Sequence, residues 1–131
     1  MIGLDTNILV RYVVQDDPAQ ARRATEIIEQ RISQQNPGFV NIVAMVETAW
    51  VLKRTYRFSD ALVAEAIERM LRIGTLIVES EQEVFTAMVA LKEGHGSFGD
   101  ALIGELGRRA GCLCTLTFDR EAALLPGFVA A

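Results

Sequence analysis

The chain has 131 residues, of which 50% are hydrophobic, and its formal net charge is −4. The hydrophobic content excludes a disordered chain, and the length suits one compact domain, so we expect residues 1–131 to form a single domain. The acidic balance argues against nonspecific nucleic-acid binding through a broad basic face. We find no membrane-spanning stretch and no signal peptide, and therefore expect a cytoplasmic protein without membrane contact.

Short apolar runs alternate with segments of helical periodicity, which predicts an α/β fold with parallel strands. Strands are predicted before Asp5 and over residues 39–42, 75–78, 112–118 and 128–129. Helices are predicted over 6–14 and 43–56, and from residues 18, 59, 80 and 100 onward. Asp17-Pro18 has the form of an N-cap followed by proline at the first helical position, and Ser80 with Glu83 has the spacing of a capping box.

Two cysteines, Cys112 and Cys114, alternate within an apolar run. Positions i and i+2 of a strand are poorly placed for a disulfide, so we interpret both as small hydrophobic residues of a strand. Gly104 and Gly107 lie inside a predicted helix, which they weaken, and this indicates close packing against another helix or subunit.

Four acids stand out from those that cap helices or lie on exposed helix faces. Asp5 and Asp119 each end an apolar strand, and parallel strands end at the same edge of a sheet, where ligands bind. Glu47 has apolar neighbours one helical turn away on either side, which is costly for an unpaired carboxylate. Asp100 begins a helix after a glycine-rich loop. Taken singly, three of these acids could be helix caps and Glu47 could pair with an arginine, whereas one shared site accounts for all four.

Four carboxylates in one place need a counter-charge, which a hard divalent cation supplies. Mg²⁺ fits best and Mn²⁺ is possible, because both prefer oxygen ligands. Such a site suits phosphodiester hydrolysis, in which the metal activates water and stabilises the charge on the phosphate. The chain has only one histidine, His95, and no serine–histidine or cysteine–histidine arrangement competes with this interpretation.

The order of short motifs along the chain resembles a known family. Asp-Thr-Asn stands at 5–7, Leu-Val-Arg-Tyr at 9–12, Gln-Asp-Asp-Pro at 15–18, a helical glutamate at 47, Gly-Asp-Ala-Leu-Ile at 99–103 and Thr-Phe-Asp-Arg at 117–120. This set resembles PIN domains, specifically the VapC-type toxins of prokaryotic toxin–antitoxin pairs. Many of those relatives have an acid where Ser97 stands in this chain.

The resemblance implies a three-layer α/β/α fold with a central parallel sheet of four to five strands. It also implies a metal-dependent endoribonuclease acting on RNA, homodimers, and inhibition by a cognate VapB-type antitoxin. The four acids assigned to catalysis and metal binding are Asp5, Glu47, Asp100 and Asp119. The residues expected to support them are Thr6, Asn7 and Thr117.

Several other residues have weaker claims. Arg11 and Arg120 are candidates for phosphate contacts. The alternative for Arg11 is an ordinary surface arginine, and the alternative for Arg120 is an interaction with a neighbouring carboxylate. His95 is expected to be a solvated loop residue rather than a substrate contact. Trp50 is expected in the core or at a dimer interface rather than as a platform for base stacking.

Two other functions are compatible with parts of the pattern. The chain could be a catalytically weak PIN module that acts mainly as the partner of an antitoxin in operon autoregulation. A phosphotransfer receiver also gathers aspartates at a sheet edge, but it needs a lysine near that edge, and neither Lys53 nor Lys92 ends a predicted strand.

Overall fold

A computed structural model describes all 131 residues as an alternation of helices and short strands. The strands are β1 (Ile2–Gly3), β2 (Gly38–Val40), β3 (Leu76–Val78), β4 (Thr115–Thr117) and β5 (Phe128–Ala130). The α-helices are α1 (Thr6–Val14), α2 (Pro18–Glu26), α3 (Ile42–Arg54), α4 (Asp60–Leu71), α5 (Glu81–Lys92) and α6 (Phe98–Arg109). A π-helical turn, η1 (Ile27–Arg31), extends α2, and a 3₁₀ turn, η2 (Ala122–Leu124), separates β4 from β5.

Polar side chains begin most of the helices. Asp17 accepts a hydrogen bond from the backbone N–H of Gln20 at 3.0 Å, and Pro18 is the first residue of α2, so this predicted cap is confirmed. The predicted capping box at Ser80 is wrong. Ser80 has a left-handed backbone (φ 54°) and makes no side-chain cap, and the Glu83 carboxylate instead accepts a hydrogen bond from Arg109 of α6.

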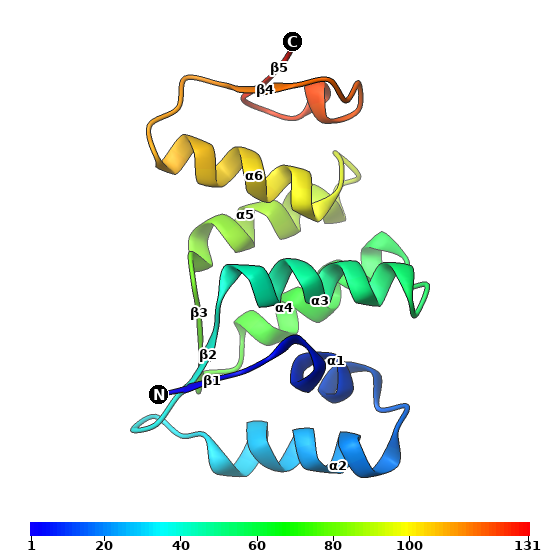
Figure 1. Ribbon diagram of the computed structural model, residues 1–131, viewed down its shortest axis with the longest axis vertical. Coiled ribbons are helices and arrows are strands. Elements are labelled where there is room, and N and C mark those ends of the chain that lie inside the picture. Colours follow the sequence, from blue (N-terminus) through cyan, green and yellow to red (C-terminus); the bar gives the residue numbers. More distant parts are fainter.

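All five strands pair in parallel, but they form two sheets rather than one. β1, β2 and β3 lie in that order, with Ile2 opposite Gly38 and Val40 opposite Val78. β4 pairs only with β5, and Figure 1 shows this pair at the opposite end of the molecule from β1. The predicted α/β class and parallel strands are confirmed. The strands that were predicted to form one central sheet of four to five strands instead form a three-stranded sheet and a separate two-stranded sheet.

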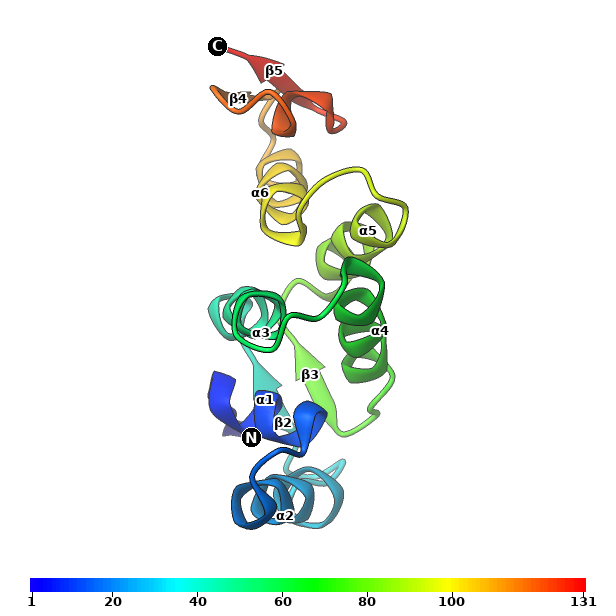
Figure 2. The ribbon, with the colours of Figure 1, turned by 90° about the vertical axis from the view of Figure 1, so that its right-hand side faces the viewer.

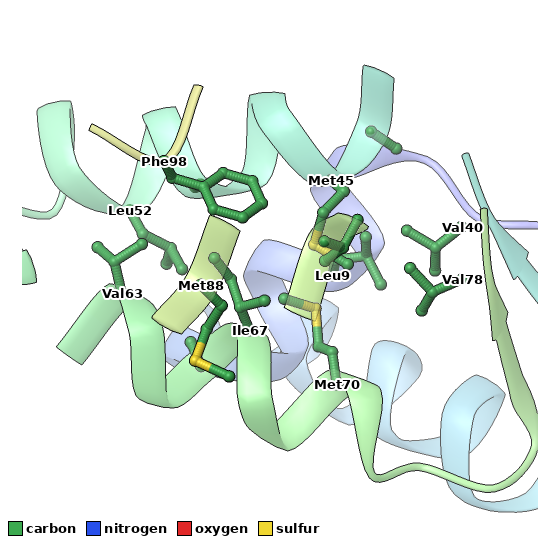
Figure 3. Close-up of a cluster of buried hydrophobic side chains, with 14 of the residues drawn as sticks. Leu9, Val40, Met45, Leu52, Val63, Ile67, Met70, Val78, Met88 and Phe98 are labelled. Carbon is green, nitrogen blue, oxygen red and sulfur yellow. The ribbon is translucent and has the colours of Figure 1, made fainter. Parts of the chain in front are cut away.

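The hydrophobic core lies between the three-stranded sheet and the helices that follow it. Figure 3 shows Met45 of α3 beside the strand residues Val40 and Val78, and Ile67 of α4 and Met88 of α5 further from the strands in the same cluster. All five are buried. Leu125 is the only member of this cluster that follows α6, so residues 110–131 contribute little to the main core.

The elements follow one another along an elongated molecule. Both views place α2 at one end and the β4–β5 pair at the other, with α6 between β4–β5 and the rest (Figures 1 and 2). The β4–β5 pair packs on α6 where that helix carries Gly104 and Gly107. A Cβ at Gly104 would lie 2.5 Å from the Phe128 ring, and one at Gly107 would lie 3.2 Å from Thr115 Oγ1. The predicted close packing at these two glycines is therefore confirmed, but the partner is a pair of strands of the same chain rather than a helix or another subunit.

The cysteines differ from the sequence interpretation. Cys112 and Cys114 are free and exposed, and they precede β4 rather than forming part of it. The turn after α6, with Gly111 at φ 97°, shortens the predicted strand by three residues at its start. No helix combines the length and the apolar character that crossing a membrane requires.

Candidate metal centre

Asp5 lies where β1 gives way to α1. The buried Leu4 fixes the chain against the core, and the exposed Asp5 follows in an extended conformation. Its Oδ1 accepts a hydrogen bond from the backbone N–H of Thr6 at 2.7 Å, so Asp5 is the N-cap of α1. The helix-capping role predicted as an alternative for Asp5 is therefore present. The capping hydrogen bond uses one of its two carboxylate oxygens.

Glu47 on α3 reaches the same place. Its Oε1 accepts a hydrogen bond from Thr6 Oγ1 at 2.5 Å, across 41 residues of sequence. The expectation that Glu47 lies among buried apolar neighbours is wrong, because Val43 is 70% exposed and Trp50 is 59% exposed. Glu47 thus projects from an exposed face of α3, where its charge carries no burial cost, and Trp50 is not a core residue.

Thr6 links the two acids. Its backbone N–H donates to Asp5 and its hydroxyl donates to Glu47, and the residue itself is buried. The sequence predicted Thr6 as a supporting residue for Asp5. Its bond to Glu47 could not be read from the sequence, because it depends on how α3 packs beside the end of β1.

Asp5 and Glu47 line one open concavity of about 350 Å³ at the carboxyl end of β1. Its remaining lining residues are Gly3, Leu4, Thr6, Asn41, Val43 and Ala44. Each carboxylate keeps one oxygen that forms no hydrogen bond within the chain. Mg²⁺ is commonly held by one or two carboxylates together with water and substrate phosphates, so this pair fits such an ion.

Asp100 and Asp119 do not join this pair within one chain. Asp100 lies in the first turn of α6, where its backbone N–H donates to the N-cap Ser97 at 3.1 Å. Asp119 follows β4, at the far end of the molecule from β1 (Figure 1). No three histidine, cysteine, aspartate or glutamate side chains come close enough together to hold one metal ion. The expected gathering of all four acids is therefore not present in the single chain.

Asp119 has local partners of its own. Its Oδ1 accepts from the backbone N–H groups of Glu121 at 2.8 Å and Ala122 at 3.2 Å, so it closes the turn that leads into η2. The backbone N–H of Asp119 donates to Thr117 Oγ1 at 3.0 Å, which places Thr117 beside the acid it was expected to support. Asn7 is exposed in the first turn of α1 and forms no side-chain hydrogen bond.

Arg11 is engaged within the chain. Its guanidinium donates to Gln20 at 2.6 Å, to Tyr56 Oη at 2.8 Å and to Asp16 at 2.9 Å. Desolvation acts to lower the pKa of Arg11, but the hydrogen bonds and charges of Asp16 and Tyr56 outweigh it and raise that pKa. This network favours the structural alternative for Arg11 over a phosphate contact.

The remaining basic candidates lie in exposed loops. Arg120 is exposed and forms no ion pair, so its guanidinium is available. His95 lies in the loop before α6, 57% of its side chain is exposed, and its Nδ1 is 3.6 Å from the Glu93 carboxylate. This is the solvated loop position that the sequence indicated for His95.

Two residues at the same sheet edge escaped the sequence interpretation. Asn41 follows β2 and caps α3 by accepting from the Ala44 N–H at 2.8 Å, and it also lines the concavity. Glu79 follows β3 and accepts from the backbone N–H of Ile42 at 2.7 Å. The signal for both was present, since each is the first polar residue after an apolar strand, as Asp5 is after β1.

A protein-family model described as "PIN domain" matches residues 2–127, which is nearly the whole chain. No curated protein and no solved structure matches the chain.

Proposed function

Because this chain belongs to the PIN domain family, whose members are generally nucleases, we propose that it is a metal-dependent endoribonuclease. In this proposal Asp5 and Glu47 bind a divalent cation, Mg²⁺ or alternatively Mn²⁺, and Asp100 and Asp119 complete the acidic site. The bound cation would activate water and neutralise charge on the phosphate. The chain's own residues hold these carboxylates in place, Thr6 above all.

The observation that carries the proposal is the meeting of Asp5 and Glu47. Two carboxylates from different elements line one concavity at the carboxyl end of a parallel strand, and the buried Thr6 hydrogen-bonds to both. Neighbouring carboxylates repel each other, and the concavity contains no arginine or lysine to balance them. A divalent cation would supply the positive charge that the lining lacks.

We further propose that the chain is the toxin of a type II toxin–antitoxin pair, inhibited by a VapB-type antitoxin and acting as a homodimer in the cytoplasm. The exposed Val43 lines the concavity beside both acids, and the exposed Trp50 follows Glu47 by three residues on α3, so a partner that covers this face of α3 would also cover the site. With a net charge of −4, the chain would favour a basic inhibitory segment.

Cleavage of single-stranded RNA by the purified chain tests the nuclease proposal. We expect cleavage with Mg²⁺, none with a chelator, and a loss of about 100-fold or more for Glu47→Gln, since even residues that only support metal ligands contribute about 10- to 100-fold. Glu65→Gln is the matched control, because Glu65 is exposed on α4 and forms no ion pair. Equal activity of the two variants would refute the role of Glu47.

A second candidate is a catalytically weak PIN module that acts mainly as an antitoxin partner in operon autoregulation. The separation of Asp119 from Asp5 within one chain favours it. Under this alternative the purified chain binds its antitoxin but shows no metal-stimulated cleavage, and Asp100→Asn changes neither property.

A further inference from the structure

Each of the two sheets leaves both of its outer strands with an unpaired edge in the single chain. β1 and β3 bond only to β2, and β4 and β5 bond only to each other, so four edges of backbone N–H and C=O groups are free. Of these four, the edges of β1 and β4 belong to the strands that Asp5 and Asp119 follow. An isolated pair of strands is marginal in water, and free edges tend to pair with another strand. Since every existing pair is parallel, a parallel β1–β4 pair would continue the pattern of both sheets.

Exposed apolar side chains gather around the same two edges. The β4–β5 unit, defined as residues 111–131, exposes Phe118 by 95% and Leu116 by 67%. Its other exposed large hydrophobic residues are Leu113, Leu124 and Val129. Near β1, Met1 and Val43 are each 70% exposed, and Val43 lines the concavity at the end of this strand. A concentration of exposed apolar side chains of this kind marks an interaction site.

The total accessible surface supports the same interpretation. The chain exposes 7921 Å². A compact monomer of 14.4 kDa exposes about 6,800 Å² by the usual scaling with mass. The excess of about 1,100 Å² exceeds the roughly 800 Å² that each partner buries in a standard interface. One chain therefore has enough uncovered surface for a stable dimer.

The position of α6 indicates which chain covers this surface. Both views place α6 between the β4–β5 unit and the rest of the molecule (Figures 1 and 2). Phe98 and Leu102 bury α6 in the core, and Phe128 packs against Gly104 on the same helix. For β4 to reach β1 of its own chain, these contacts would have to be broken. The β1 edge of a second copy can be reached with all of them kept.

We propose that two copies of this chain exchange their β4–β5 units, so that β4 of each copy pairs in parallel with β1 of the other. With Gly3 opposite Thr117, Asp119 of one copy lies at the same strand end as Asp5 of the other. Each acidic site then takes Asp5 and Glu47 from one copy and Asp119 from its partner. The part that concerns the acids rests on the proposed nuclease function, whereas the strand exchange does not.

Disulfide trapping tests the exchange without any activity measurement. In a background with Cys112→Ser and Cys114→Ser, one chain carries Gly3→Cys and another carries Thr117→Cys. A side chain at Gly3 meets nothing within 4 Å, so this substitution fits. Neighbouring strands lie about 4.8 Å apart, within the Cα separation of a disulfide. We expect the mixed chains to form a covalent dimer on mild oxidation.

Ala130→Cys in place of Thr117→Cys is the matched control. Ala130 lies opposite Thr117 on β5, one strand further from β1, at about 10 Å and beyond disulfide reach. A single chain carrying both Gly3→Cys and Thr117→Cys distinguishes the alternatives. A disulfide between these two cysteines within one chain would overturn the exchange, because it would show that β4 pairs with β1 of its own chain. Absence of any specific disulfide would overturn it as well.

Mixing two inactive variants tests the shared site. If the site is shared, a dimer of one Asp5→Asn chain and one Asp119→Asn chain has one intact site and one doubly altered site. Random pairing then restores about one quarter of wild-type cleavage after co-refolding. No restoration from two correctly folded inactive variants would overturn the shared site. If the cysteine variants form the covalent dimer but the wild-type chain cleaves no RNA, the nuclease function is refuted and the exchange still stands.

Discussion

The ends of β1 and β4 carry the same local signal and differ in everything around it. Asp5 and Asp119 both follow a short strand, and the carboxylate of each accepts a hydrogen bond from a backbone N–H just after it. Asp5 belongs to a sheet packed on a large core and meets Glu47 from another element. Asp119 belongs to a two-stranded sheet with exposed apolar side chains, and no other acid joins it. A strand-end carboxylate becomes part of a site only when tertiary packing brings a second one.

The largest expected difference between the two regions is in stability. Leu52 of α3 is fully buried in the core. We expect Leu52→Ala to lower the free energy of unfolding by about 2–5 kcal/mol, through lost burial and the cavity it leaves. Urea denaturation followed by circular dichroism measures this value. A loss below about 1 kcal/mol would show that the α3 core is not packed as described.

A smaller effect is expected where the β4–β5 unit packs on α6. A methyl group at Gly104 would lie 2.5 Å from the Phe128 ring. We expect Gly104→Ala to cost about 1–3 kcal/mol from overpacking, even though alanine is the better helix former. Adding Phe128→Leu should recover part of this loss in a double-mutant cycle. A stabilising Gly104→Ala would contradict the close approach of β5 to α6.

A weaker effect, dependent on pH, is expected at the network around Arg11. Desolvation acts to raise the pKa of Asp16, but hydrogen bonds from Tyr56 and Arg11 outweigh it and lower that pKa. A lowered pKa stabilises the fold above the unfolded value near pH 4, and this stabilisation is lost as the pH falls through the folded value. We therefore expect Asp16→Asn to reduce stability at pH 7 and to make no difference at pH 2. An equal effect at both pH values would contradict the charge network.

The smallest effect on the stability of an isolated chain is expected at β4. Phe118 is 95% exposed, so Phe118→Ser should change the free energy of unfolding by less than about 0.5 kcal/mol at concentrations where the chain is monomeric. At dimer-forming concentrations the same change should weaken association, as sedimentation would show. A large loss in the monomer would place Phe118 in a core.

The sequence predicted what depends on neighbouring residues. The parallel α/β class follows from the alternation of apolar runs and helical periodicity, and the Asp17–Pro18 helix start follows from capping chemistry. The burial of Glu47 was predicted wrongly, because an apolar helix face can be left uncovered as well as buried. Nothing in the local pattern of residues 111–131 distinguishes a strand of the main sheet from a strand of a second sheet.

No local pattern in the sequence indicates the separation of Asp119 from Asp5. Their distance depends on where α6 directs the chain, and this is decided by packing at Gly104 and Gly107 rather than by either acid. The Thr6–Glu47 hydrogen bond, in contrast, joins two residues that the sequence had both selected. Spacing along the chain therefore identified the polar residues at the strand ends but not which of them meet.

The most direct test of the central claim is Mn²⁺ binding by the purified chain, followed by electron paramagnetic resonance. We expect the wild-type chain and Glu65→Gln to bind Mn²⁺ with equal affinity, and Glu47→Gln to bind at least about 10-fold more weakly. Binding unchanged by Glu47→Gln and Asp5→Asn would contradict a metal site at the end of β1.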